Sequence, residues 1–486
     1  MRWGRNRHIM PSIRRWVLLA AALSLVALCA CSVKPAGEKE MISADYGQVF
    51  VYLSGGREVA DAAFTLAGMS FINRDGVRHE VTPEVVSIRS GKSEDSQIRL
   101  GIFHLPSGSY DILQWRVWVP EGASAAGSGN DRPLSPAANA ENSITVSTSI
   151  NLRVERGGSQ CLFVRWGLMP GVENATRMRP RFSATGQQLE ISRLLAYVTN
   201  TGSDCVTVID KQADRVVGTI GVGKAPRGIA LNKDGSVLYV ANSGSNDISV
   251  IDTGANRVVR TIGTYVESPV ELALSRDDRV LFASAPDAGM VLAIDSYAGV
   301  ISNRIRVGRN PMAIVADDDH RKIYAANSDS MSVSVIDMDA PVVLSTIRLN
   351  GKPGSMALCG DRLFIGDSGQ RALMAMEIPS YVVKPIYTGF VPGGIACGLS
   401  DRVYVGNLTR HEIAFFHRKV GTVTRQIPVG TDPAALAVDD AVKKIYAINT
   451  GSDDVSVIDI TGQKRIKTLQ VGKHPHGIVT VNQSRS

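Results

Sequence analysis

The sequence predicts an all-β protein in which an N-terminal β-sandwich is followed by a seven-bladed β-propeller closed by the C-terminal strand. Three observations support this fold class. From residue 194 on, a Tyr/Phe-x-x-Asn-like segment recurs seven times in steps of 40 to 43 residues. Before it, between residues 48 and 167, short β-type runs alternate with turns rich in Gly, Pro and Asp. Finally, the whole repeat region begins on the second strand of a repeat unit and ends on the first strand of one.

Residues 1–31 are predicted to be a lipoprotein signal peptide rather than part of the fold. Five arginines accompany the apolar stretch Trp16–Leu28, which has the length of a signal core and is too short to span a bilayer. The segment Leu28-Cys29-Ala30-Cys31 resembles a bacterial lipobox with Cys31 as the lipidated residue, although Cys29 stands where Ala or Ser is usual. The alternative is an ordinary secretory signal cleaved nearby. Residues 32–45 would form a tether.

The charge balance bears on the partners. The chain has a formal net charge of +7, but five of its 53 cationic residues lie in the predicted signal, which has no acidic residue. The mature chain is therefore close to neutral, which argues against nucleic acid as a partner. We expect attachment to a membrane through acyl chains on Cys31, each buried methylene contributing roughly 0.8 kcal/mol. The predicted location is the cell envelope, on the periplasmic or surface side of a bacterial outer membrane.

Residues 46–168 are predicted to form the sandwich. Residues 169–193 show no strong hydrophobic period and are predicted to form a linker. Strand-like runs include Val49–Leu53, Ile98–Phe103 and Tyr110–Val117. Short strands at this spacing favour an antiparallel sandwich. The segment Leu105-Pro106-Ser107-Gly108-Ser109-Tyr110 resembles a motif of transthyretin-like envelope modules. That resemblance implies a turn at the glycine and a tyrosine that enters the sandwich edge.

From residue 194 to the end, each repeat has the size of a propeller blade with four strands. In one unit, Arg227–Leu231 is the inner strand, Val237–Asn242 the second, Ile248–Asp252 the third and Arg257–Ile262 the outer one. The aromatic residues that mark the seven second strands are Tyr197, Tyr239, Phe282, Tyr324, Phe364, Tyr404 and Tyr446.

The repeats resemble a known family. Tyr197-Val198-Thr199-Asn200 and Tyr239-Val240-Ala241-Asn242, together with Val-x-Val-Ile-Asp at 206–210, 333–337 and 455–459, are similar to the YVTN family of β-propeller repeats, of the YncE-like and surface-layer type. The resemblance covers residues 194–486 and implies a propeller of seven blades. Blades five and six depart from the pattern at Leu373–Glu377 and Phe415–His417, so we expect these two blades to be specialised.

The two ends of the repeat region predict how the propeller closes. The region starts on a second strand, Leu194–Asn200, and ends on an inner strand, His476–Val481. These pieces can complete one blade, which leaves the ring without an open edge. Aspartates at the end of the third strand are expected to hydrogen-bond their own turns. The prolines that precede the seven inner strands are Pro226, Pro269, Pro311, Pro353, Pro392, Pro433 and Pro475.

The mature chain has four further cysteines, Cys161, Cys205, Cys359 and Cys397. An oxidising compartment permits disulfides, but four cysteines allow three complete pairings, and the sequence does not choose among them. Burial without pairing is the alternative for all four. None belongs to a Cys-x-x-Cys-His motif, so covalent haem is not indicated.

A propeller site is expected at the mouth of the central channel, next to the prolines. Most residues there are small or apolar, and the candidates for binding are Arg227, Glu271, His474 and His476. A lactonase-type enzyme would need several inward carboxylates and histidines. We therefore expect no catalytic residues, no metal and no cofactor. For His474-Pro475-His476 the interpretations are a polar contact at the channel mouth or, as the alternative, a metal-binding pair. For Asp317-Asp318-Asp319-His320 they are a solvated turn or, as the alternative, a cation site.

These features favour a non-catalytic binding or scaffolding protein of the cell envelope. Loops on the expected functional face mix Lys and Arg with Asp and Glu, which suits a protein partner better than a polyanion. The alternative is an enzyme of the lactonase-like or quinoprotein-like propeller class, with its site at the channel mouth. The fold does not decide between them.

Overall fold

A computed structural model describes residues 45–55, 63–85, 87–89, 97–118, 143–169, 179–187, 194–265, 267–367, 369–398, 401–419 and 421–481. These residues form strands and turns, and no helix occurs among them. The predicted signal with Cys31, and the tether up to residue 44, lie outside the described residues. A helix with the length and hydropathy of a membrane span is not found in the part of the chain that the structure describes.

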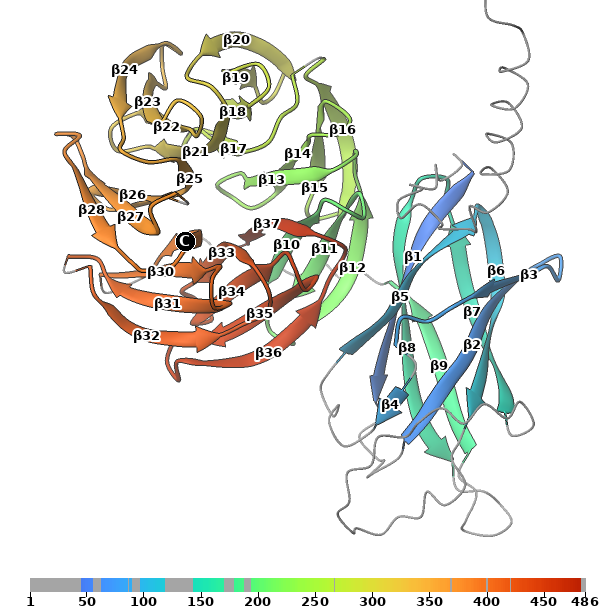
Figure 1. The fold of residues 1–486 in the computed structure, drawn as a ribbon. Coiled ribbons are helices and arrows are strands. Elements are labelled where there is room, and N and C mark those ends of the chain that lie inside the picture. The colour runs from blue at the N-terminus through green and yellow to red at the C-terminus, as the bar shows by residue number, and fades with distance from the viewer. Residues whose placement is uncertain are drawn as a thin grey trace, which may run out of the picture. The chain divides into compact units, whose positions relative to one another are not determined.

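The N-terminal module consists of two β-sheets (Figure 1). One has the strand order β5-β1-β8-β9, and in it β1 and β8 are parallel. The other has the order β3-β2-β6-β7, with β4 paired to β2. Their bounds are β1 (Tyr46–Gly55), β2 (Ala63–Asn73), β3 (Arg78–Val81), β4 (Ser87–Arg89), β5 (Gln97–Pro106), β6 (Gly108–Trp118), β7 (Ser143–Val154), β8 (Ser159–Met169) and β9 (Arg179–Gly186).

The two sheets share one hydrophobic core, to which both contribute large aromatic side chains. Trp115 of β6 and Trp166 of β8 are fully buried there. Trp115 stacks on Phe182 with ring centroids 5.1 Å apart. Tyr110 is also buried, and its hydroxyl donates to the Pro106 carbonyl oxygen at 2.8 Å, which fixes the β5–β6 turn.

One boundary prediction is wrong. Part of the predicted linker, residues 179–186, forms strand β9, which pairs with β8 from Leu162 to Met169. Its sequence, Arg-Pro-Arg-Phe-Ser-Ala-Thr-Gly, has few apolar residues, and Phe182 is the buried one that anchors it. With Phe182 and Ala184 as its apolar residues beside Pro180, the segment shows too little period-2 alternation to predict a strand.

The C-terminal part contains sheets of four strands, arranged side by side around a common centre (Figure 1). The first combines β10 (Leu195–Asn200), β11 (Cys205–Asp210) and β12 (Arg215–Gly221) with the last strand, β37 (Pro475–Thr480). In it, β37 pairs antiparallel with β10, with Tyr197 opposite Val479.

In the further sheets of this part that the structure describes, the four strands follow one another in the sequence. They are β13 (Pro226–Leu231), β14 (Val237–Asn242), β15 (Asp247–Asp252) and β16 (Arg257–Gly263); β17 (Leu272–Leu274), β18 (Val280–Ala285), β19 (Met290–Asp295) and β20 (Val300–Arg306); β21 (Pro311–Asp317), β22 (Lys322–Asn327), β23 (Ser332–Asp337) and β24 (Val343–Arg348); β25 (Pro353–Cys359), β26 (Arg362–Asp367), β27 (Ala372–Glu377) and β28 (Val383–Tyr387); β29 (Pro392–Cys397), β30 (Arg402–Asn407), β31 (Glu412–His417) and β32 (Val423–Pro428); and β33 (Pro433–Asp439), β34 (Lys444–Asn449), β35 (Asp454–Asp459) and β36 (Lys464–Gln470).

The turns between third and outer strands follow the predicted chemistry. The Asp210 carboxylate accepts hydrogen bonds from the backbone N–H of Gln212 at 2.8 Å and of Ala213 at 3.0 Å. Asp295 makes the same turn with Tyr297 and Ala298. These aspartates therefore shape turns, as expected from an Asx turn.

Hydrophobic clusters lie between neighbouring sheets rather than within one. One cluster packs Tyr239 and Ile248 against Leu281 and Leu292 of the next sheet. The last sheet meets the first in the same way, since Tyr446 and Val455 pack with Ala196 and Val198. Each sheet thus buries both of its faces, which explains why its middle strands are apolar nearly throughout.

Candidate functional site

Three of the predicted site residues lie on neighbouring inner strands of the propeller. His476 is on β37 and Arg227 on β13, each one residue after the first proline of its strand, and Glu271 directly precedes β17. The Thr199 hydroxyl joins two of these strands, because it donates to the Arg227 carbonyl oxygen at 2.6 Å and accepts from the Gly477 N–H at 2.9 Å. We call Arg227, Glu271 and His476 the channel cluster.

Glycines allow the three strands to approach closely. A β-carbon on Gly228 would lie 2.5 Å from the Val270 carbonyl oxygen, and one on Gly477 would lie 2.7 Å from the Arg227 carbonyl oxygen. The Gly228 N–H donates to that Val270 oxygen at 2.8 Å. The side chains of the channel cluster are therefore held by backbone contacts between neighbouring strands.

The three residues of the cluster keep some solvent exposure, but burial of their titratable groups still sets the protonation of the cluster. It raises the pKa of Glu271 to about 7, and the Arg227 charge opposes this rise only in part. Burial and the Arg227 charge together lower the pKa of His476 to about 4. Near neutral pH the cluster thus holds a cationic arginine, a neutral histidine and a carboxyl group close to its midpoint of titration.

Two nitrogens of the cluster are buried without a hydrogen-bond partner. They are Nε of Arg227 and Nδ1 of His476. Buried polar atoms are nearly always satisfied in folded proteins, so such a pair indicates where a ligand atom or an ordered water would bind. A neutral imidazole nitrogen can donate or accept, whereas the arginine nitrogen can only donate.

His474, the fourth predicted residue, does not join the cluster. It is exposed in the turn before β37, with a φ of 49°, and its N–H donates to the Asp453 carboxylate at 2.7 Å. Among the described residues, no hydrogen bond or ion pair links its ring to the other three. The two histidines of His474-Pro475-His476 therefore have different environments.

The acidic run at 317–320 has an internal role that the sequence did not reveal. Asp317 is buried at the end of β21, where it accepts from the Tyr324 hydroxyl at 3.1 Å and contacts the His320 ring at 3.0 Å. In the described part of the chain, no group of three or more His, Cys, Asp or Glu side chains is placed to hold a metal ion.

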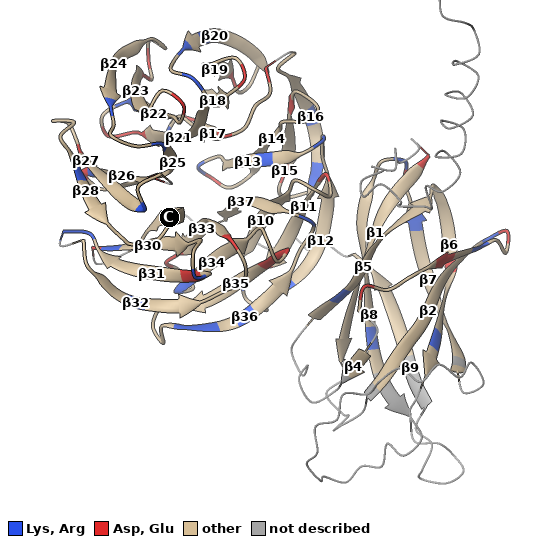
Figure 2. Ribbon diagram, in the orientation of Figure 1, with Lys and Arg blue, Asp and Glu red and all other residues tan. Residues whose placement is uncertain are grey.

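Charges of both signs are spread over the propeller. Figure 2 shows Lys and Arg interspersed with Asp and Glu on its strands and loops. Several opposite charges are paired, such as Lys322 with Asp337 at 2.8 Å and Arg304 with Glu267 at 2.8 Å. Over the part of the propeller that the structure describes, basic and acidic side chains are thus mixed.

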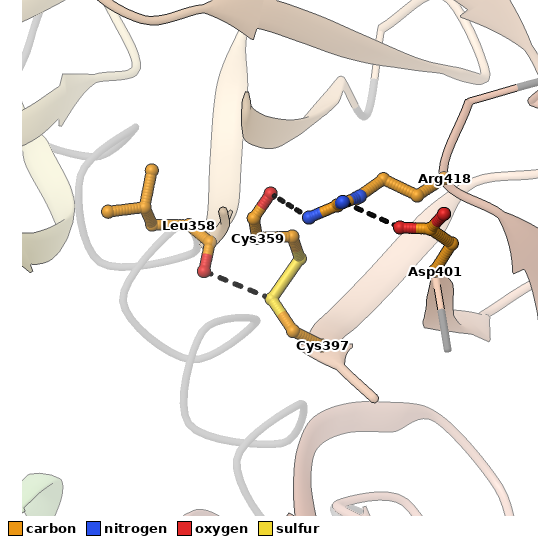
Figure 3. The surroundings of a disulfide bond; sticks show 5 residues. All are labelled: Leu358, Cys359, Cys397, Asp401 and Arg418. Carbon is orange, nitrogen blue, oxygen red and sulfur yellow. Dashed lines mark hydrogen bonds and ion pairs between the residues drawn. A yellow bond between two sulfur atoms is a disulfide. The ribbon is translucent and has the colours of Figure 1, made fainter. Parts of the chain in front are cut away.

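One disulfide joins blades five and six, between Cys359 of β25 and Cys397 of β29 (Figure 3). Arg418, which follows β31, donates to the Cys359 carbonyl oxygen at 3.1 Å and pairs with Asp401 at 2.6 Å. Both cysteines end their inner strands, whereas the channel cluster lies at the other end of the inner strands. The disulfide therefore braces the propeller away from the cluster.

The remaining two described cysteines are unpaired. Cys161 and Cys205 are free and fully buried. Burial raises the pKa of both thiols, that of Cys205 to about 12, so neither is reactive as a thiolate at neutral pH.

Comparison with known proteins agrees with this architecture. The family model described as YNCE-like beta-propeller matches residues 183–485. Among curated proteins there is no significant match to this chain.

Several solved structures share the fold. A chain of hydrazine synthase from Kuenenia stuttgartiensis is 17% identical, with a TM-score of 0.50, covering 54% of this chain and 91% of that one. A functionally unknown protein from Desulfotomaculum acetoxidans is 16% identical, with a TM-score of 0.52 and coverages of 59% and 98%. A Bacteroides uniformis protein provisionally assigned as a 6-phosphogluconolactonase is 15% identical, with a TM-score of 0.51 and coverages of 60% and 100%. Since the matched family model spans well over half of the sequence, this chain belongs to the YNCE-like β-propeller family.

Proposed function

We propose that this protein is a lipid-anchored envelope protein whose seven-bladed propeller acts as a non-catalytic binding module. Its ligand or protein partner would place a hydrogen-bonding group on the channel cluster. The observation that carries this proposal is the pair of buried, unpartnered nitrogens of Arg227 and His476 on neighbouring inner strands. Unsatisfied buried donors are costly unless a bound group or water satisfies them.

Closure of the ring is part of this proposal, because a rigid channel needs it. Support comes from the pairing of β10 with β37 and from the packing of the last sheet on the first. The buried contact of Lys211 with Asp439 and with the Val481 carbonyl oxygen joins the same three segments. A closed ring also leaves no inner sheet edge for aggregation.

The envelope location rests on the sequence of residues 1–31 and is consistent with the Cys359–Cys397 disulfide, since disulfides persist in oxidising compartments. The test is metabolic labelling with radioactive palmitate. We expect label on the wild-type protein and none on Cys31→Ala, which would remain in the uncleaved form. Equal labelling of both would contradict lipidation at Cys31.

The binding role can be tested by capture from detergent-solubilised envelopes. The bait proteins are the wild type, Arg227→Gln and the control Arg425→Gln, which changes an exposed arginine on β32. A partner that uses the channel cluster is retained by the wild type and the control and lost from Arg227→Gln. A partner captured equally by all three would bind elsewhere and contradict the proposed site.

A second candidate function is a lactonase-like or quinoprotein-like enzyme. The observation in its favour is the pKa of Glu271, which burial raises to about 7, the range suited to general acid–base catalysis. The discriminating assay is hydrolysis of δ-gluconolactone by the wild type and by Glu271→Gln. Hydrolysis that disappears in the variant would favour the enzyme, whereas equal background rates would favour the binding module.

A further inference from the structure

A separate cavity of about 310 Å³ lies between blades three and four, away from the channel cluster. Its walls come from the end of the outer strand β20 and from β23 and β24 of the next blade. The polar residues that line it are Arg306, Ser330, Ser332, Ser334, Thr346 and Arg348. We call it the arginine–serine groove, and every charged side chain that lines it is cationic.

The serine hydroxyls of the groove are set up as donors. The Ser332 and Ser334 oxygens accept hydrogen bonds from the Asn327 side-chain amide at 3.2 and 2.9 Å. The Ser330 oxygen accepts from the Arg309 N–H at 2.8 Å. Each hydroxyl also carries a proton. No hydrogen bond donated by Ser330, Ser332 or Ser334 is found among the described residues, although the buried Asn327 Oδ1 beside two of them is itself without a partner. The groove can therefore offer three O–H donors to a bound group.

The strand register brings an arginine to the same place. Arg348 lies directly opposite Ser332 in the β23–β24 ladder, and Thr346 lies opposite Ser334. Cross-strand partners share one face of a sheet, so all four side chains are on the face that lines the groove. Arg306 reaches it from the outer strand of the preceding blade. Within the described ranges, no ion pair or hydrogen bond of the Arg306 or Arg348 side chain is found.

Comparison among the blades shows that this combination is specific to blade four. The residue opposite the Asn at the end of the second strand is Ser332 here, but Asp247 in blade two and Asp454 in blade seven. There the Asn amide donates to the carboxylate at 2.6 Å in both blades. Blade six has Glu412 at this position. Blades one, three and five have the neutral residues Cys205, Met290 and Ala372 at the equivalent position, so blade four is distinguished by its hydroxyl.

The outer-strand residue that pairs with this third-strand position also differs among the blades. Arg348 is replaced by Gly263 in blade two, Pro428 in blade six and Gln470 in blade seven. Blade three has Arg306 at this position, so two adjacent blades bring arginines to one groove. Blades one and five have Gly221 and Tyr387 there, so among the described outer strands the arginines at this position come from blades three and four, and two arginines beside hydroxyls suit an anion.

We propose that the arginine–serine groove binds a phosphate dianion, either free or as the monoester of a small organic molecule. Two arginines match its charge, and three hydroxyls can donate to its oxygens. Hydrogen bonds to a charged phosphate are stronger than hydrogen bonds between neutral groups. The cavity volume lies at the lower end of the range for small-molecule sites and leaves space for an organic group.

The test is isothermal titration calorimetry on the full-length protein in detergent, with phenyl phosphate, inorganic phosphate and phenol as probes. The first variant is Ser332→Asp, which restores the carboxylate that blades two and seven carry at this position and which the fold therefore tolerates. The second is the exposed double change Arg306→Gln/Arg348→Gln. Arg425→Gln is the matched control.

We expect both phosphate probes to bind and phenol to give no signal. Loss of one charge-assisted hydrogen bond weakens binding about tenfold or more, so both groove variants should show at least that loss, while the control keeps wild-type affinity. Tighter binding of phenyl phosphate identifies a monoester as the ligand, and equal binding identifies free phosphate. The proposal is overturned if neither phosphate probe binds at about 10 mM, or if Ser332→Asp binds as tightly as the wild type.

Discussion

Lys211 and Asp439 form a buried ion pair that connects the first sheet of the propeller to the last. Lys211 follows β11, Asp439 ends β33, and their side chains are 1% and 0% exposed. The Lys211 ammonium also donates to the Val481 carbonyl oxygen, directly after β37. A second pair between the same sheets, Lys444 with Asp214 at 2.7 Å, lies nearby. Three segments distant in sequence, residues 211–214, 439–444 and 481, are thus held together where the last sheet meets the first.

Removal of one member of the buried pair should destabilise the propeller strongly. Lys211→Met leaves the Asp439 carboxylate without its cation in a dry environment, and such changes cost about 3–5 kcal/mol. The measurement is the free energy of unfolding in urea. The control is Lys384→Met, which breaks a more exposed pair with Glu377 and should cost at most about 1 kcal/mol. Equal effects of the two changes would contradict the structural role of Lys211.

The C-terminal strand should be required for stability. Deletion of residues 473–486 removes β37 and exposes the β10 edge together with apolar side chains such as Tyr197. We expect the truncated propeller to unfold or aggregate. Thermal melting checks this, and addition of a 473–486 peptide in trans should raise the melting temperature again. A truncated protein with the wild-type melting curve would sink the prediction.

Stability should depend on pH through Glu271 in an unusual direction. Its pKa rises from 4.5 to about 7 on folding, so between these values the folded state binds more protons than the unfolded chain. The free energy of unfolding therefore falls as pH increases through this window, by roughly 1–3 kcal/mol. Glu271→Gln should be more stable than the wild type at pH 8 and nearly equal to it at pH 4.5.

His476 should act with the opposite sign. Its pKa falls from 6.5 to about 4 on folding, so the unfolded chain binds more protons and stability is lost as pH decreases through that window. His476→Gln should remove this acid sensitivity. Urea unfolding of both variants from pH 4 to 8 is the measurement, and profiles parallel to that of the wild type would show that neither group titrates as described.

The disulfide should stabilise blades five and six. The two cysteines are 38 residues apart, and closing a loop of that size contributes about 3–4 kcal/mol in the chain-entropy model. Dithiothreitol should lower the melting temperature of the wild type and have no effect on Cys359→Ser/Cys397→Ser, which should melt at the temperature of the reduced protein. A wild-type melting temperature insensitive to full reduction would contradict this.

The repeat made the strands of the second blade predictable to within a residue. The unit predicted at 227–262 is observed as β13 to β16 from Pro226 to Gly263, because prolines and Asx turns mark the strand ends. Strand β9 was missed since its sequence has a weak apolar pattern, and the pairing of Cys359 with Cys397 could not be chosen because it depends on which inner strands are neighbours.

The candidate sites differ in how far the sequence could reach them. Counting one residue past each proline identified Arg227 and His476, because the repeat places equivalent residues at equivalent depths. His474, the residue before Pro475, was also a candidate, but it lies in the exposed turn. Lys211 with Asp439, and Arg306 with Arg348, were missed, since each pair joins different blades. Alignment of the repeats could have shown Ser332 in place of Asp247 and Asp454, but not the arginine of the preceding blade beside it.

Hydrogen–deuterium exchange of strand β10 tests most directly whether the last strand completes the first blade. If Leu195–Asn200 is paired on both sides, its amides should be as protected as those of Val237–Asn242, the equivalent strand β14. Fast exchange of alternate amides in Leu195–Asn200, as in a strand with one free edge, would contradict closure of the propeller and the binding site built on it.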